Sequence, residues 1–136
     1  MNARFFGLLV AAVIVVAGCR ADPGIDTISV SELAAQIGAA SAPVILDVRT
    51  AREFDAGHVP GAINVPHTEI PDRIEEISAF KNSEVVVYCG SGKRAAMAEA
   101  DLLAAGFSNI RDLEGHMLEW NAGGFPLQGL PESAEE

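Results

Sequence analysis

Residues 85–107 read VVVYCGSGKRAAMAEADLLAAGF, a β-branched run followed by a glycine-rich turn and an alanine- and leucine-rich stretch. The run that ends at Tyr88 is apolar at successive positions, which is typical of a strand covered on both faces of a parallel sheet. The stretch that follows predicts a helix from Arg94 to Ala105, ended by Gly106. This unit of strand, turn and helix favours a parallel sheet with helices packed on it.

The rest of the chain repeats the same alternation. Short apolar runs predict five strands, at residues 27–30, 44–48, 62–65, 84–88 and 109–113. Helical patterns lie between and after them, at residues 31–37, 51–55, 69–77, 94–105 and 116–121, and Ser29 with Glu32 can form a capping box before the first. The sequence therefore predicts an α/β domain with an open five-stranded parallel sheet and helices on both faces.

Length and charge narrow the class of protein. The 136 residues, 49% of them hydrophobic, suit one globular domain, which the patterns place at residues 27–128. With 19 acidic against 9 basic residues, the formal charge of −10 repels phosphate backbones, so no nucleic-acid partner is expected. Residues 129–136 form an acidic tail with little to bury, which predicts disorder.

The N-terminus has the pattern of an export signal. Arg4 precedes thirteen apolar residues at 5–17, and a helix of that length rises only about 20 Å, short of the roughly 30 Å hydrocarbon core of a bilayer. A signal peptide at residues 1–18 is therefore expected. The stretch VAGC at 16–19 resembles the lipobox of bacterial lipoproteins, in which the cysteine is acylated. An ordinary signal peptide with an incidental cysteine and a retained anchor are the alternatives.

This interpretation predicts a lipid on Cys19 and a short spacer over residues 19–26, with the domain exported and held at the periplasmic side of a bacterial membrane. The chain has two cysteines, so lipidation of Cys19 leaves Cys89 alone and excludes an internal disulfide. A lone thiol in an oxidising compartment is a liability unless it is buried or used.

Cys89 lies at the carboxyl end of a predicted strand, where parallel sheets place their ligand sites. Gly90 and Gly92 allow the loop to curl so that backbone amides point at the sulfur, and Lys93 and Arg94 add positive charge beside a helix N-terminus. These features favour an anion, so Cys89 is predicted to be a thiolate. One alternative is an inert core cysteine. The other, a phosphate-binding loop, lacks the Walker spacing.

These residues carry a family resemblance. The Cys89–Arg94 loop resembles the active-site loop of the rhodanese superfamily, and other stretches match that family in order: ILDVR at 45–49, EF at 53–54, GHVPGAINVP at 57–66, AGF at 105–107 and LEGHMLEW at 113–120. The resemblance spans roughly residues 27–128. It implies the rhodanese fold and a cysteine that carries a sulfane sulfur as a persulfide.

The resemblance also implies a reaction. Relatives that act on phosphate or arsenate have a C-x5-R loop, whereas four residues separate Cys89 from Arg94 here, which implies sulfur chemistry. Cys89 is then the catalytic residue of a thiosulfate sulfurtransferase, with cyanide, a small thiol or a protein thiol as acceptor and no cofactor. The loop residues Gly90, Ser91, Gly92, Lys93 and Arg94 are expected to bind the substrate. The alternative is a non-enzymatic persulfide carrier or an envelope-stress binding module, and a monomer is expected.

Other polar residues have structural interpretations. Asp47 and Arg49, near Glu53, are expected to form an ion pair that fixes the loop after the second strand. His58 is expected to fix a turn by a hydrogen bond, and the three histidines are too scattered for a metal site. Trp120 is expected in the core.

Two positions bear on substrate choice. His116 stands where relatives commonly have a second glycine, and it is expected at the rim beside the cysteine loop, where it would narrow the mouth or add charge at acidic pH. Gly90 has no side chain, which is expected to leave the pocket open to a larger acceptor.

Overall fold

The computed structural model describes residues 24–129. Five parallel strands form one open sheet in the order β1-β5-β4-β2-β3. Their bounds are β1 (Asp26–Ile28), β2 (Val44–Asp47), β3 (Ile63–Asn64), β4 (Val85–Tyr88) and β5 (Ile110–Leu113). Because β4 lies at the centre of the sheet, all four of its residues are buried, as the apolar run predicts.

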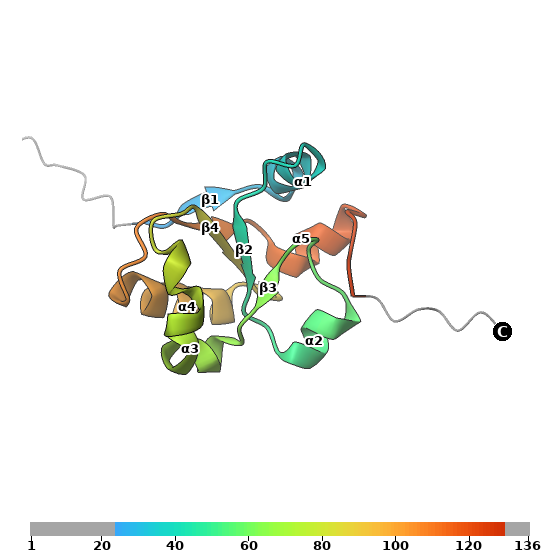
Figure 1. Ribbon diagram of the computed structural model, residues 1–136. Coiled ribbons are helices and arrows are strands. Elements are labelled where there is room, and N and C mark those ends of the chain that lie inside the picture. Colours follow the sequence, from blue (N-terminus) through green and yellow to red (C-terminus); the bar gives the residue numbers. More distant parts are fainter. Residues whose placement is uncertain (1–23, 130–136) are drawn as a thin grey trace, which may run out of the picture.

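Helices cover both faces of the sheet, which confirms the predicted architecture (Figure 1). One face carries α3 (Ile70–Ile77) and α4 (Lys93–Ala104), and the other carries α1 (Val30–Gly38) and α5 (His116–Ala122). Three shorter elements complete the fold: α2 (Ala51–Ala56) and the 3-10 helices η1 (His67–Glu69) and η2 (Ser78–Phe80). Each face has its own apolar cluster, one closed by Leu102 of α4 and the other by Trp120 of α5.

Local side-chain caps fix where helices begin. The Ser29 hydroxyl accepts a hydrogen bond from the Glu32 amide, and the Thr50 hydroxyl accepts one from the Glu53 amide. Strand β1 begins at Asp26. Because the Ser29 cap starts α1 at Val30, β1 ends at Ile28. The predicted strand at 27–30 was therefore placed two residues too far along the chain at its end.

The strand register brings polar side chains to one edge of the sheet. Asp47 at the end of β2 pairs with Tyr88 at the end of β4, and Val87 of β4 pairs with Asp112 of β5. Because the strands are parallel, their carboxyl ends meet at this edge. Cys89, the next residue after β4, therefore lies between an acidic residue of β2 and one of β5.

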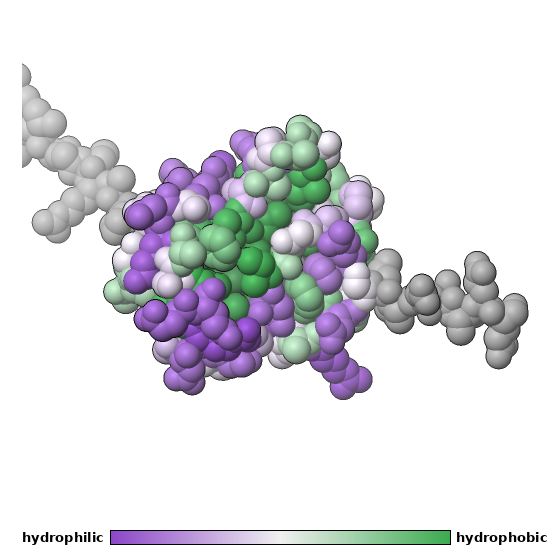
Figure 2. Space-filling view, viewed as in Figure 1, coloured by the Kyte–Doolittle hydropathy of each residue, from purple (hydrophilic) through white to green (hydrophobic). Residues whose placement is uncertain are grey.

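The surface carries much of the acidic charge on α3. Figure 2 shows a strongly hydrophilic area where Figure 1 places this helix, and the side chains of Asp72, Glu75 and Glu76 are exposed there. Over the described part of the chain, no helix combines the length and the hydropathy that a membrane span requires. The predicted signal peptide at residues 1–18 and Cys19 lie outside the described residues, as does nearly all of the predicted tail.

Candidate active site

Cys89 begins the loop between β4 and α4. Its Sγ accepts a hydrogen bond from the Gly92 amide at 3.0 Å, and Gly92 has a φ of 121°, a conformation that favours glycine. The start of α5 holds the other side of the loop, since the Met117 amide donates to the Cys89 carbonyl at 3.1 Å and the Leu118 amide to the Gly90 carbonyl at 3.3 Å. The loop is thus fixed from both ends.

The sulfur of Cys89 is well shielded. The residue is 1% exposed and closes the apolar cluster under α3 and α4. One backbone amide bonds to Sγ within the described residues, where the sequence predicts several. The sulfur is therefore buried and has one main-chain donor, and the predicted thiolate stays a prediction.

Arg94 lies over this loop, and its charge is already paired. Its two terminal nitrogens donate to the two carboxylate oxygens of Glu53 at 2.8 and 3.0 Å. The hydrogen bond from Arg94 lowers the pKa of Glu53, and the same bond raises the pKa of Arg94, with a smaller contribution from Cys89. Glu53 also lies near Arg49, as expected from the sequence, since both line one hollow, but its hydrogen-bonded partner is Arg94.

The remaining loop positions differ in what they can contact. A Cβ at Gly90 would lie 3.2 Å from the Arg94 Nη2 atom, so the guanidinium fills the space beside this glycine. The expectation that Gly90 leaves the pocket open to a larger acceptor stays a prediction. Ser91 and Lys93 have exposed side chains, and Lys93 is the first residue of α4.

Asp47 and Arg49 form the predicted ion pair, at 2.6 Å, with side chains that are 0% and 8% exposed. Asp47 also accepts a hydrogen bond from the Tyr88 hydroxyl at 2.6 Å, and Arg49 donates to the Gly57 carbonyl at 2.8 Å. Tyr88 in turn accepts from the Val59 amide. Burial, and then the charge of Asp47, raises the pKa of Tyr88, so its hydroxyl stays protonated and donates. We call these three side chains, Asp47, Arg49 and Tyr88, the β2 cluster.

His58 lies at the turn after α2. Its Nδ1 donates to the Phe54 carbonyl at 2.8 Å, and its ring stacks on the Phe54 ring with 3.6 Å between centroids. These contacts are those of the turn-fixing hydrogen bond that the sequence predicts. Trp120 is fully buried, and its indole nitrogen donates to the Pro126 carbonyl, as expected of a core residue.

His116 lies beneath the loop. It is 5% exposed, and its Nδ1 accepts a hydrogen bond from the Cys89 amide at 3.1 Å. Its φ is 52°, a left-handed conformation that explains why a glycine suits this position. The ring packs on Gly92, where a Cβ would lie 3.0 Å from Nε2. The predicted position at the rim of the pocket is therefore wrong, because the ring turns inward to the Cys89 amide.

Glu99 of α4 is a buried acid that the sequence analysis missed. It is 6% exposed, and its Oε1 is a buried atom without a hydrogen-bond partner among the described residues. It belongs to the inward face of α4, together with Ala95, Ala98 and Leu102. The positions 95, 98, 99 and 102 have the spacing of an apolar helical face. A glutamate at one of them could therefore have been recognised from the sequence as a buried acid.

A hollow of about 270 Å³ lies between α2 and α5, next to residues that contact the loop. Arg49 and Glu53 supply its charged walls. Met117, whose amide donates a hydrogen bond to the Cys89 carbonyl, supplies part of its apolar wall. The other lining residues are Ala56, Gly57, Asn121 and Leu127. A molecule in this hollow would face a cation, a carboxylate, an amide and apolar groups.

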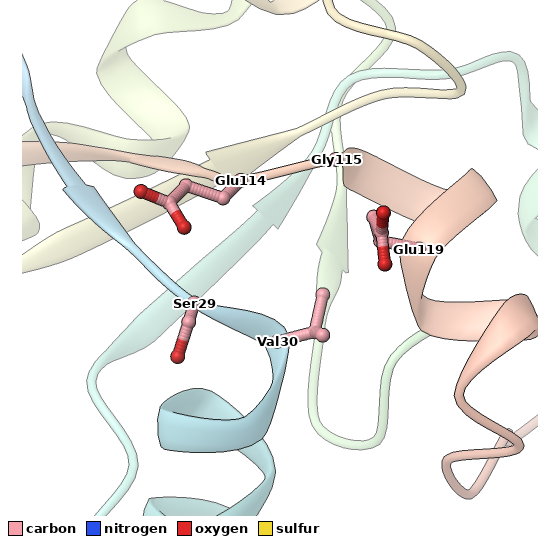
Figure 3. A pocket seen from close by; sticks show the side chains of 5 residues that line it. All are labelled: Ser29, Val30, Glu114, Gly115 and Glu119. Carbon is pink, nitrogen blue, oxygen red and sulfur yellow. The ribbon is translucent and has the colours of Figure 1, made fainter.

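A second hollow of about 310 Å³ lies between the start of α1 and α5 (Figure 3). Its lining comprises Ser29, Val30, Glu114, Gly115 and Glu119, with two carboxylates and no basic side chain. An anionic ligand does not suit such a lining. Over residues 24–129, no group of three or more His, Cys, Asp or Glu side chains could hold a metal ion.

Comparisons with known proteins find relatives that are named sulfurtransferases. A relative named thiosulfate sulfurtransferase 16, chloroplastic, from Arabidopsis thaliana is 40% identical over 93 residues, covering 61% of this chain and 78% of the relative. A protein named sulfurtransferase from Allochromatium vinosum is 36% identical over 84 residues, covering 62% and 77%. The chain spans about half, 51%, of the length of other curated plant relatives that it matches.

Solved structures show the same fold. The rhodanese-like domain of an Anabaena sp. protein, solved by NMR, has a TM-score of 0.70 at 28% identity, covering 82% of this chain and 84% of that one. Residues 29–123 match the family described as Rhodanese-like domain. Because this match covers most of the chain, and relatives and fold agree with it, the chain belongs to the family of rhodanese-like domains.

Proposed function

We propose that the protein is a sulfurtransferase that moves a sulfane sulfur from an anionic donor such as thiosulfate to a thiol or cyanide, through a persulfide on Cys89. The observation that carries the proposal is the position of the Cys89 sulfur. It lies at the carboxyl end of the central strand, with the Gly92 amide donating to it at 3.0 Å and the Arg94 guanidinium over its loop. A family membership shared with named sulfurtransferases supports the same chemistry.

The first half-reaction forms one bond and breaks one. The Cys89 thiolate attacks the outer sulfur of thiosulfate, a new S–S bond forms, and the bond between the outer sulfur and the sulfite group breaks. Sulfite leaves with the electron pair of that bond, and the persulfide anion Cys89–S–S⁻ remains, so charge and atoms balance. The Gly92 amide is placed to stabilise this anion.

The second half-reaction returns the enzyme to its resting state. A thiolate or cyanide attacks the outer sulfur of the persulfide, forms a new bond to it and releases the Cys89 thiolate. The hollow of about 270 Å³ between α2 and α5 is the proposed site for a thiol acceptor, because it offers Arg49 and Glu53 to polar groups and Met117 to an aliphatic part.

Arg94 is the proposed contact for an anionic donor, in competition with Glu53. The bidentate pair already satisfies the guanidinium, so a donor must displace the carboxylate or share the remaining N–H groups. Lys93, exposed at the start of α4, is the second proposed cation. We therefore expect weak thiosulfate binding, and the variant Arg94→Ala is expected to raise KM for thiosulfate more than it lowers kcat.

The direct test uses the intact mass of the full chain after incubation with thiosulfate. The expected result is the addition of one sulfur atom, located to Cys89 by peptide mapping and removed by cyanide. Cys89→Ser is the matched control, because it keeps Cys19 and is expected to gain no sulfur. Sulfur uptake without transfer to cyanide or any thiol would favour a persulfide carrier, and no uptake from any sulfane donor would favour a binding module.

Export and lipidation form a separate part of the proposal, and they rest on residues 1–19 of the sequence. Acylation of Cys19 would hold the domain at the periplasmic side of a bacterial membrane. Inhibition of lipoprotein signal peptidase by globomycin is expected to cause the unprocessed precursor to accumulate, and Cys19→Ala is expected to abolish membrane association. A wild-type protein that fractionates away from membranes would contradict this part alone.

A further inference from the structure

Three titratable side chains from three elements meet beneath Cys89. His116 begins α5, Asp112 lies in β5, and Glu99 lies on the inward face of α4. His116 and Glu99 are 5% and 6% exposed. We call these three side chains the β5 cluster. No step of the proposed sulfur transfer uses them directly, yet His116 bonds the main chain of the residue that does.

The hydrogen bonds fix where the protons lie. The Nδ1 atom of His116 accepts from the Cys89 amide at 3.1 Å, so a neutral ring carries its proton on Nε2. Nε2 lies 3.5 Å from Oδ1 of Asp112, which accepts as a carboxylate. Were His116 protonated on both nitrogens, two donors would face each other at Cys89. The position of the Cys89 amide therefore requires a neutral His116.

Glu99 completes the chain of groups. It faces the Asp112 carboxylate, whose side chain is 26% exposed, and two adjacent carboxylates that are buried or partly buried cannot both be ionised without an energetic penalty. Burial, then Asp112, and then a negative charge at Cys89 raise the pKa of Glu99 to about 9. Burial acts against ionisation of Asp112 as well, but hydrogen bonds from His116 and Glu99 lower the pKa of Asp112. Glu99 thus holds the proton, and Asp112 holds the charge.

We propose that the β5 cluster is a buried relay that positions the Cys89 main chain through His116 and stores one proton on Glu99 while the Cys89 sulfur carries negative charge. The inference rests on the proposed sulfur transfer, which requires that charge as thiolate and as persulfide. The groups that face His116 are Cys89 from the loop, Asp112 from β5 and, through Asp112, Glu99 from α4. None of the three touches the substrate, so they are positioning residues.

The coupling between Glu99 and Cys89 has to act in both directions. A negative sulfur favours the protonated form of Glu99, and by linkage a protonated Glu99 favours the negative sulfur. Loss of the Glu99 proton would place a second buried negative charge near the thiolate or persulfide. The unpartnered Oε1 is consistent with a group held in its neutral form, because an ionised oxygen without a donor would be far more costly to bury.

The first test is infrared spectroscopy of the full chain, which detects the C=O stretch of a protonated carboxyl group. We expect this band at pH 7, its loss with a midpoint near pH 9, and its absence in Glu99→Gln. Asp101→Asn, which changes an exposed acid on the same helix, is the matched control and should keep the band. In Cys89→Ser the band is expected to disappear at a lower pH. A midpoint that stays the same in Cys89→Ser, or a missing band at pH 7, would overturn the proposal.

The second test separates positioning from simple packing. His116→Gly suits the left-handed backbone but removes the acceptor for the Cys89 amide, whereas His116→Asn tolerates that backbone and places an oxygen near the position of Nδ1. We expect persulfide formation to slow about tenfold in the glycine variant and to recover in the asparagine variant. Equal rates in both variants would overturn the positioning role. The infrared test needs no sulfur donor, so failure of the proposed function would leave its result intact.

Discussion

Cys89 lies between two buried polar clusters that differ in how completely their hydrogen bonds are satisfied. In the β2 cluster, Asp47 accepts from Arg49 and Tyr88, Arg49 also donates to the Gly57 carbonyl, and the Tyr88 oxygen accepts from the Val59 amide. In the β5 cluster, Glu99 keeps a buried oxygen without a partner, and its proton is held against Asp112. The two clusters flank the same loop, one on the β2 side and the other on the β5 side of the central strand β4.

This difference in hydrogen bonding indicates that one cluster has a structural role and that the other can change its protonation state. A network in which each charged group has its partners resists change, because removal of any member leaves another buried and unpaired. A network with one spare acceptor and one movable proton can gain or lose that proton near the range of solution pH. We infer that the β2 cluster fixes the loop between β2 and α2, while the β5 cluster responds to the charge on Cys89.

The largest expected effect comes from breaking the β2 cluster at its acid. Asp47→Ala leaves the Arg49 guanidinium buried without its partner, at 2.6 Å in the wild type, and the protein is expected to lose about 3–5 kcal/mol of stability. Urea denaturation followed by circular dichroism measures this loss. Asp55→Ala, which removes an exposed acid of α2, is the control and should change stability by less than about 0.5 kcal/mol. Equal losses in the two variants would show that the cluster is not a scaffold.

A smaller effect is expected from Tyr88→Phe. This variant keeps the ring but removes the hydroxyl that donates to Asp47 at 2.6 Å and accepts from the Val59 amide at 3.1 Å. The Val59 amide then loses its partner and Asp47 loses one of its donors, so a loss of about 1–3 kcal/mol is expected in the same denaturation experiment. Thr27→Val removes an exposed hydrogen bond to Glu114 as a comparison, and it should have little effect.

The two clusters also differ in how far the sequence reveals them. The β2 cluster is local: Asp47 and Arg49 are two residues apart after an apolar strand, so an ion pair there could be predicted. The strands and helices could be predicted for the same reason, since period and caps such as Ser29 and Thr50 act within a few residues. Several ends differ by one or two residues, for example at β3, which spans Ile63–Asn64 where residues 62–65 were predicted, and at α1, where the Ser29 cap decides between strand and helix.

The β5 cluster depends on contacts between residues that lie apart in the sequence. His116 was predicted at the rim because its neighbours in sequence border the cysteine loop, yet its ring turns inward to bond the Cys89 amide. Pairing of Glu53 with Arg94 joins residues 41 positions apart, and no local pattern distinguishes it from a pair with Arg49. Glu99 could have been noticed on the apolar face of its helix, but its partner Asp112 lies on strand β5, which no local pattern connects to α4. Tertiary packing decides each of these cases.

The β5 cluster makes stability depend on pH in a way that the β2 cluster does not. The pKa of Glu99 is raised from 4.5 to about 9 in the folded protein, so the folded state binds the proton more tightly than the unfolded state between these values. Stability linked to this group is therefore fully present below pH 4.5 and is lost as the pH rises toward 9. We expect the free energy of unfolding to fall more steeply over this range in the wild type than in Glu99→Gln. Parallel curves for the two proteins, measured by urea denaturation at several pH values, would contradict the assignment.

The smallest effect on stability is expected at the ion pair between Arg94 and Glu53. Their side chains are 29% and 39% exposed, so Glu53→Gln should cost less than about 1 kcal/mol. The pKa of Glu53 is lowered by Arg94, so the stability from this pair is present above pH 4.5 and is lost as the pH falls below that value. Glu76→Gln, at an exposed pair on α3, is the control.

The same variant is expected to have a clearer effect on activity than on stability. Removal of the Glu53 charge frees the guanidinium for an anionic donor and removes a negative charge from the wall of the neighbouring hollow. KM for thiosulfate should therefore fall by up to about fivefold, the factor that corresponds to about 1 kcal/mol of competition, while use of an uncharged sulfane donor changes little. A fall of equal size for both donors would mean that Glu53 acts through the shape of the loop rather than through its charge. Because the pair is partly exposed, added salt should narrow the difference between the wild type and Glu53→Gln, whereas the buried Asp47–Arg49 pair should be almost insensitive to salt.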